Sequence, residues 1–277
     1  MPNTAPNDSL LLWSTQDGVT TLTMNNPRRL NGWTMEMMDA LKAGLKRAAS
    51  DDATQALILT GSDPYYCAGV NLGASLKLAH PARLHQMIRV HNQALFDAFL
   101  NFPKPILAAV NGPAIGAAVT SATLCDAIIA SEKATFNTPF GKLGVPPEGC
   151  SSVVFEKLVG VQAQRILGDE GWQPTGQEAL DIGLVEFLSP HEQLMSRAHA
   201  IARTWIEEGR TRSYPAGMQK DELKRINATE SIAVATAFLS PPFLIGQFQF
   251  LWSKGKRGPA LMFLMLRMTQ PIWGLMI

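Results

Sequence analysis

Short apolar runs alternate with longer amphipathic stretches through the first half of the chain. Residues 56–60, 106–110 and 127–131 are continuous apolar runs, which are typical of strands buried on both faces. Between these runs, residues 85–99 and 116–124 have the spacing and composition of helices. Because strands that alternate with helices form parallel sheets, we expect an α/β fold with a parallel sheet at its centre.

The segments on either side of this region extend the pattern. Residues 10–14 and 19–24 are strand-like, and Asp17-Gly18 between them is a hairpin signal. Residues 35–49 place methionine and leucine side chains on one helical face. After residue 150 the pattern is helical, with segments expected at 151–159, 161–168, 176–182, 190–208, 216–227 and 229–239.

The last part of the chain, residues 241–277, is apolar with a basic centre formed by Lys254, Lys256 and Arg257. A membrane-spanning helix needs about 20 apolar residues and tolerates central charge poorly. Arg267 also interrupts the final apolar run. We therefore expect this segment to make a weak membrane contact or a contact between subunits rather than to span a bilayer.

Composition narrows the classes of partner. The 277 residues carry a net charge of +1, which gives no electrostatic basis for nucleic-acid binding. Charged residues make up 17% of the chain, below the usual quarter, so we expect surface to be buried between subunits. The three cysteines show no paired spacing and are interpreted as reduced thiols. The five histidines show no metal-ligand spacing, so no metal site is expected.

Residues 104–152 contain three acids, and one of them, Glu148, has apolar surroundings rich in glycine and proline. The other acids there are Asp126, at the head of a strand-like run, and Glu132, in an expected turn. A carboxylate kept from water is a good proton shuttle, because burial raises its pKa toward neutrality. The alternative interpretation is a first-turn residue stabilised by the dipole of the following helix.

Three motifs in the same stretch are AVNGPAIGA, LCDAIIASEKATF and LGVPPEGCSS. With them, the chain resembles the crotonase (enoyl-CoA hydratase/isomerase) superfamily, and within it the Δ3,Δ2-enoyl-CoA isomerases of the peroxisomal type. The resemblance covers roughly residues 10–240. It implies a crotonase (ClpP-like) spiral of β-β-α units with a C-terminal helical trimerisation region. The expected domains are a loose N-terminus at 1–8, the spiral core at 9–200, a helical oligomerisation region at 201–240, and an apolar extension of unknown role at 241–277.

The resemblance also implies a reaction, the isomerisation of 3-enoyl-CoA to trans-2-enoyl-CoA in fatty-acid β-oxidation. Glu148 would move the proton from C2 to C4, and the backbone amides of Ala68 and Ala117 would form the oxyanion hole. The two glutamates of the superfamily's hydratases fall at Thr120 and Phe140 here, and neither residue can act as a carboxylate base.

The expected substrate is an acyl-CoA. Arg28 suits phosphate recognition, although a solvated surface residue is an equal alternative. The stripe formed by Met35, Met38 and Leu41 is interpreted as core rather than as acyl pocket, and Cys67 as a buried structural thiol. The residues expected to bind substrate are Arg28, Leu30, Gly69, Val70, Asn71, Leu72, Gly116, Phe140 and Pro147.

The remaining expectations concern cofactor, assembly and location. The reaction needs no cofactor besides the coenzyme A of the substrate, and the protein forms a homotrimer or a dimer of trimers. The location is expected to be intracellular, with peroxisome, mitochondrion and cytosol all open, since the chain ends in Leu-Met-Ile rather than Ser-Lys-Leu. The alternatives are a non-catalytic acyl-CoA-binding or scaffold protein, and another crotonase reaction such as hydration.

Overall fold

A computed structural model describes residues 10–70 and 80–274. A six-stranded sheet in these residues has the order β1-β2-β3-β4-β6-β8. β1 and β2 form the expected antiparallel hairpin, and each later neighbour pairs in parallel. The strands are β1 (Leu11–Gln16), β2 (Val19–Met24), β3 (Ala56–Gly61), β4 (Ile106–Val110), β6 (Ala127–Ser131) and β8 (Phe187–Ser189). The predicted α/β class with a parallel sheet is confirmed.

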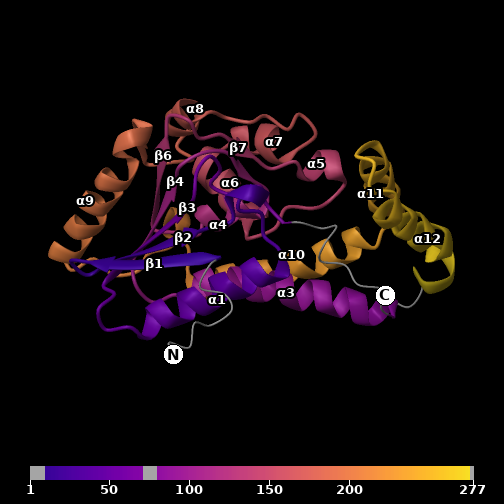
Figure 1. Cartoon of the computed structure of the whole chain (residues 1–277), viewed down its shortest axis with the longest axis horizontal. Coiled ribbons are helices and arrows are strands. Elements are labelled where there is room, and N and C mark those ends of the chain that lie inside the picture. The colour runs from indigo at the N-terminus through magenta and orange to yellow at the C-terminus, as the bar shows by residue number, and fades with distance from the viewer. Residues whose placement is uncertain (1–9, 71–79, 275–277) are drawn as a thin grey trace.

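Both faces of the sheet are covered, which explains the continuous apolar runs. Alternate side chains of β3 pack on opposite sides, Ile58 toward α9 (Leu194–Glu207) and Leu57 toward the main core. α9 lies along one face of the sheet in Figure 1, while α1 (Met35–Ser50) and α3 (Pro81–Asn101) lie on the other. A helix on each side leaves no solvent face on the central strands.

The loops after the parallel strands build a second, smaller layer. β4 continues into β5 (Ala114–Ile115) and α4 (Ala117–Ala122), and β6 continues into β7 (Phe136–Asn137) and α5 (Phe140–Leu143). β5 pairs in parallel with β7, and Cys67, in the loop after β3, pairs with Ala114. These repeats are the expected spiral of β-β-α units. The two-residue strands of the second layer are too short for a hydrophobic pattern to predict.

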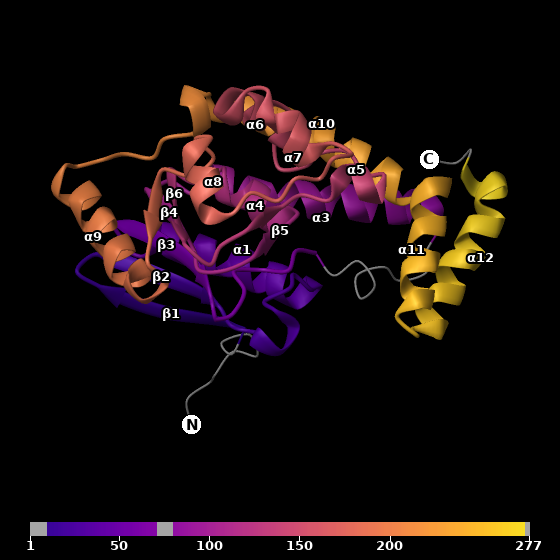
Figure 2. The ribbon, with the colours of Figure 1, turned by 90° about the horizontal axis from the view of Figure 1, so that it is seen from above.

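The predicted break between helical segments 216–227 and 229–239 is wrong. α10 (Lys220–Phe238) runs without interruption through residue 228 and lies beside α3 in both views (Figures 1 and 2). Asn227 faces α3 and donates hydrogen bonds from Nδ2 to the Gln93 carbonyl and to Asp97 Oδ1, both at 3.0 Å. Buried polar residues thus interrupt the apolar period without interrupting the helix.

The predicted domain boundary at residue 200 falls inside α9, and Trp205 of α9 still packs on the sheet. The remaining helices follow the predicted segments. They are α6 (Ser151–Val159), α7 (Gln162–Leu167), α8 (Gly176–Asp181) and η2 (His191–Gln193). Two short helices, η1 (Pro27–Arg29) and η3 (Pro215–Gly217), were not predicted as separate elements.

The apolar extension forms a hairpin of two helices, α11 (Pro241–Ser253) and α12 (Arg257–Trp273). It packs on the far ends of α3 and α10, at the end of the molecule opposite α9 (Figures 1 and 2). No single helix in the described chain is long and apolar enough to span a membrane; only α10 and α11 taken together meet that test, with a 63° bend between them. The exposed apolar side chains of the hairpin are Phe250, Trp252, Leu261, Met265, Met268 and Ile272. The expected contact with a membrane or subunit stays a prediction.

Asp126, noted in the sequence as an acid at the head of a strand, forms a buried ion pair. Its Oδ2 accepts from the Ile106 amide at 2.8 Å and from Arg212 Nη1 at 2.7 Å. The side chains of Asp126 and Arg212 are 0% and 5% exposed. Removal of either partner would leave the other charge buried without compensation.

Replacement of Asp126 by alanine is therefore expected to lower the free energy of unfolding by about 3–5 kcal/mol in urea denaturation. The control is Asp39→Ala, which breaks an exposed pair with Lys42 (2.8 Å, Asp39 56% exposed) and should cost no more than about 1 kcal/mol. Equal losses in the two variants would contradict the structural role of the buried pair.

Candidate functional site

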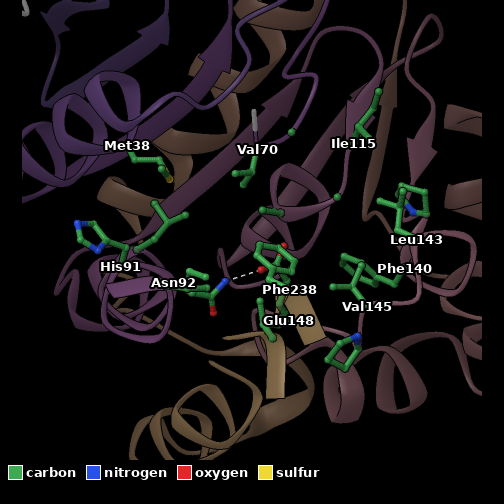
Figure 3. A pocket seen from close by; sticks show the side chains of 18 of the residues that line it. Met38, Val70, His91, Asn92, Ile115, Phe140, Leu143, Val145, Glu148 and Phe238 are labelled. Carbon is green, nitrogen blue, oxygen red and sulfur yellow. Dashed lines mark hydrogen bonds between the residues drawn. The ribbon is translucent and has the colours of Figure 1, made fainter. Parts of the chain in front are cut away.

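A cavity of about 470 Å³ opens between α1, α3, α10 and the loops that follow β3, β4 and β6 (Figure 3). The loops leave the carboxyl ends of parallel strands, where α/β folds commonly bind ligands. Most of the lining is aliphatic, aromatic or methionine. The sequence-predicted residues that line it are Ala68, Gly69, Val70, Gly116, Ala117, Phe140 and Glu148.

Glu148 reaches the cavity from the loop between α5 and α6 and is 8% exposed. Burial raises the pKa of the Glu148 carboxyl from 4.5 to about 7. A hydrogen bond from Asn92 opposes that rise, and the charge of Glu230 adds to it. The carboxyl can therefore both accept and release a proton near neutral pH, as the sequence predicted.

Asn92, on α3, is a site residue that the sequence pattern did not reveal. Its Nδ2 donates to Glu148 Oε2, the bond drawn as a dashed line in Figure 3. Its Oδ1 accepts from Ser231 Oγ, on α10, at 2.8 Å. In the sequence, Asn92 is only a polar residue in a long amphipathic helix. Most such residues face solvent, so the pattern did not mark it as part of a site. Only the packing of α3 against α10 gives Asn92 a partner.

The turn after Glu148 is tightly packed and needs glycine. Gly149 has φ +65°, and a Cβ there would lie 2.5 Å from Phe96 Cε1 and 2.7 Å from Thr120 Oγ1. Cys150 follows with φ +66° before α6 begins. The small side chain of Thr120 thus leaves the space through which this turn passes.

Ala117 and Val70 line the cavity from neighbouring loops. Ala117 is the first residue of α4, where an amide has no intrahelical acceptor. Val70 follows Gly69 (φ +80°), and a Cβ on Gly69 would lie 2.7 Å from the Ile115 carbonyl. Within residues 10–70 and 80–274, neither the Ala117 nor the Val70 amide donates a hydrogen bond. The two loops therefore present unpaired donors side by side.

The prediction that the Ala68 amide stabilises an oxyanion is wrong. Its N–H donates to the Leu30 carbonyl at 2.9 Å, so it is not available to a ligand. Two residues later, the Val70 amide donates no hydrogen bond within the described residues. Hydrophobic pattern cannot separate these positions, because the difference lies in the backbone bond from Ala68 to Leu30.

Three other predicted binding residues, Arg28, Leu30 and Pro147, do not line the cavity. Arg28 is exposed on η1, and the partly exposed Leu30 contacts the site through its carbonyl. Pro147 does not line the cavity, whereas its neighbour Pro146 does. Asn71 and Leu72 are outside the described residues.

The methionine stripe of α1 divides between core and cavity. Leu41 is fully buried in the core, as predicted. Met38 also belongs to the core cluster and Met35 packs against it, but both line the cavity as well, so the core interpretation is incomplete for these two. Cys67 is fully buried, and burial raises the pKa of its thiol to about 12, in keeping with a structural role. Among the described residues, no group of three or more histidine, cysteine or acidic side chains could hold a metal ion.

The spiral of β-β-α units and the buried acid in a mostly apolar cavity are the features that the sequence resemblance implied. A family model described as enoyl-CoA hydratase/isomerase matches residues 14–231. This chain belongs to that family, the crotonase superfamily that its motifs resemble.

Similar proteins include isomerases. Human enoyl-CoA delta isomerase 2 is 32% identical over 254 residues, which cover 89% of this chain and 64% of the human protein. This chain therefore spans less than two thirds of that relative. Mouse peroxisomal enoyl-CoA delta isomerase 3 is 30% identical over 258 residues, with 89% and 79% covered. The crystal structure of an enoyl-CoA hydratase/isomerase from Pseudoalteromonas atlantica superposes with a TM-score of 0.73, at 26% identity and 88% and 97% coverage.

Replacement of Glu148 by glutamine is expected to stabilise the protein at high pH. The folded chain holds the Glu148 proton up to a pKa of about 7 and the unfolded chain to about 4.5, so ionisation costs stability as pH rises between these values. The variant should match the wild type below pH 4.5 and exceed it above pH 7 by on the order of 3 kcal/mol. Urea unfolding at a series of pH values measures this, with the exposed Glu156→Gln as a pH-independent control.

Proposed function

We propose that this protein isomerises 3-enoyl-CoA, cis or trans, to trans-2-enoyl-CoA, a step of the β-oxidation of unsaturated fatty acids. The observation that carries the proposal is the cavity with one acid, Glu148, whose pKa is about 7, beside two unpaired backbone amides. The similarity to two delta isomerases supports the same reaction.

The reaction moves one proton and one double bond. The ionised Glu148 takes the proton from C2 of the thioester, and the electron pair of that C–H bond delocalises over the dienolate. The charge then rests largely on the thioester oxygen, where the amides of Val70 and Ala117 donate hydrogen bonds. The protonated Glu148 returns the proton to C4, the double bond forms between C2 and C3, and the carboxylate is restored.

The polar groups around Glu148 suit this shuttle. Asn92 donates to one carboxylate oxygen and so holds the side chain in one orientation in both protonation states. Ser231 in turn fixes the amide group of Asn92. The apolar lining excludes water from a carbanion-like intermediate.

Hydration is not the proposed reaction, because it needs a second carboxylate to handle water. Among the described lining residues, Glu148 is the one acid. Thr120 is fully buried and donates its hydroxyl to the Ala117 carbonyl at 3.3 Å, and Phe140 places an aromatic ring in the wall. An enzyme with these groups can move a proton along the acyl chain but has no pair of carboxylates to activate a water.

The proposed substrate is an acyl-CoA whose chain occupies the apolar cavity. The proposal calls on no metal or redox cofactor, because double-bond transposition leaves the oxidation level of the substrate unchanged. Assembly into a homotrimer or a dimer of trimers is part of the same proposal and would bury exposed apolar surface.

Replacement of Glu148 by glutamine or alanine is expected to lower kcat for 3-hexenoyl-CoA by about 10²–10⁴-fold or more, because the variant has no proton carrier. In the wild type, kcat/KM should rise with pH through about 7, as Glu148 ionises. Acyl-CoA binding should persist in both variants by calorimetry. A wild type that binds 3-enoyl-CoA and leaves it unchanged would instead identify a non-catalytic binding protein, and water addition to crotonyl-CoA would identify a hydratase.

Replacement of Ala117 by proline tests the oxyanion donor. Proline is well tolerated at the first position of a helix, so the fold of α4 should persist while the N–H is lost. We expect kcat to fall by about 10²–10³-fold. Ala117→Ser keeps the N–H and serves as the control. A proline variant as active as the serine variant would remove Ala117 from the mechanism.

A further inference from the structure

Glu230, on α10, is a buried acid that the reaction scheme above does not use. It is 6% exposed and lies behind the turn that carries Glu148. Its Oε2 accepts from the Cys150 amide at 2.6 Å, and its Oε1 accepts from the Ser152 amide at 2.9 Å. These amides lie at the start of α6, so a side chain from α10 supplies the N-terminal cap of α6.

The hydrogen bonds of Glu230 favour its ionised form. Burial raises the pKa of its carboxyl, and the hydrogen bonds from Ser152 and Cys150 oppose that rise. Each of its two oxygens accepts a backbone N–H, and such bonds are stronger to a carboxylate than to a neutral carboxyl group. A helix N-terminus also favours a negative charge. The cap thus places a carboxylate charge beside the turn of Glu148.

The next residue of α10 acts on Glu148 from the other side. Ser231 holds Asn92, and Asn92 holds the Glu148 carboxylate. Glu230 holds the backbone two residues after Glu148, where Gly149 and Cys150 both have positive φ. Ser231 therefore helps to fix the side chain of Glu148, and its neighbour Glu230 fixes the backbone turn that follows Glu148.

We propose that Glu230 is a positioning residue for Glu148: it clamps the turn after the proton carrier and sets a fixed negative charge next to it. The proposal rests on the proposed role of Glu148 and deepens it. A cap made by a neutral side chain would hold the turn equally well but would not favour protonation of Glu148.

Among residues 10–70 and 80–274, Glu230 is the carboxylate whose charge acts on Glu148. α3 presents the neutral Asn92 and, along the cavity wall, His91, whose Nδ1 lies 2.7 Å from the Met87 carbonyl. α4 presents Thr120, and α10 presents Ser231 and Glu230. Burial is the largest cause of the raised pKa of Glu148, and the charge of Glu230 adds to it. Removal of that charge should let Glu148 ionise at lower pH.

The test is a titration of Glu148 by carbon-13 NMR in protein labelled at the glutamate carboxyl, with the signal assigned by its loss in Glu148→Gln. In Glu230→Gln we expect the titration midpoint to fall by about half a pH unit, at the low end of what a neighbouring charge does. The rise of kcat/KM with pH, which follows the ionisation of Glu148, should shift to lower pH together with the midpoint. Glu156→Gln, which removes an exposed acid from α6, is the control and should leave both unchanged.

Glu230→Asp separates the clamp from the charge and serves where the glutamine variant does not fold. The shorter side chain keeps the charge but cannot reach both amides. Its Glu148 midpoint should stay near that of the wild type, while kcat falls about tenfold, the effect of one lost hydrogen bond to a charged group. An unchanged midpoint in Glu230→Gln, or an unchanged kcat in Glu230→Asp if only that variant folds, would overturn the proposal.

The titration needs no substrate, so the two hypotheses can fail separately. A wild type without isomerase activity would overturn the proposed function and leave the midpoint shift to be judged on its own. An active wild type whose Glu148 midpoint is the same in Glu230→Gln would overturn the role of Glu230 and leave the isomerase intact.

Discussion

The site depends on one constraint: the carboxyl group of Glu148 is buried away from water and must still be able to gain and lose a proton. Burial raises the pKa of Glu148 to about 7, and the hydrogen bond from Asn92 limits that rise. Without that donor the pKa of the carboxyl would lie still higher, whereas a carboxyl exposed to water would keep a pKa near 4.5 and would rarely hold a proton at neutral pH. The contact between α3 and α10 supplies the donor and its support, so the packing of two distant helices sets the chemistry of one side chain.

The spiral positions the other half of the site. Successive β-β-α units place the loops after β3 and β4 side by side, and the close approach of Gly69 to Ile115 brings two free amides to one wall. The opposite wall continues into the C-terminal hairpin. Leu84, Val145 and Phe238 line the cavity and also belong to the cluster formed with α11 and α12. The apolar extension is thus packed against one wall of the cavity.

Two positions in the site fit one another. Thr120 is small enough to leave room for the Gly149 turn, and Gly149 has no side chain to meet Thr120 or Phe96. A longer acidic side chain at position 120 would occupy the space of that turn. Position 120 thus carries a small neutral side chain where the Gly149 turn passes, and the acid of the cavity stands at position 148.

The sequence by itself determined the strands, most helices and the solitary acid, because these depend on local apolar periodicity and on the composition of residues 104–152. Its motifs also identified the family. Only the tertiary structure decided that Val70 rather than Ala68 offers a free amide, because that depends on the backbone turn at Gly69 and on the bond to Leu30. It likewise decided the hydrogen-bond partners of Asn92 and Glu230, because the packing of the helices determines which group each of these polar side chains contacts.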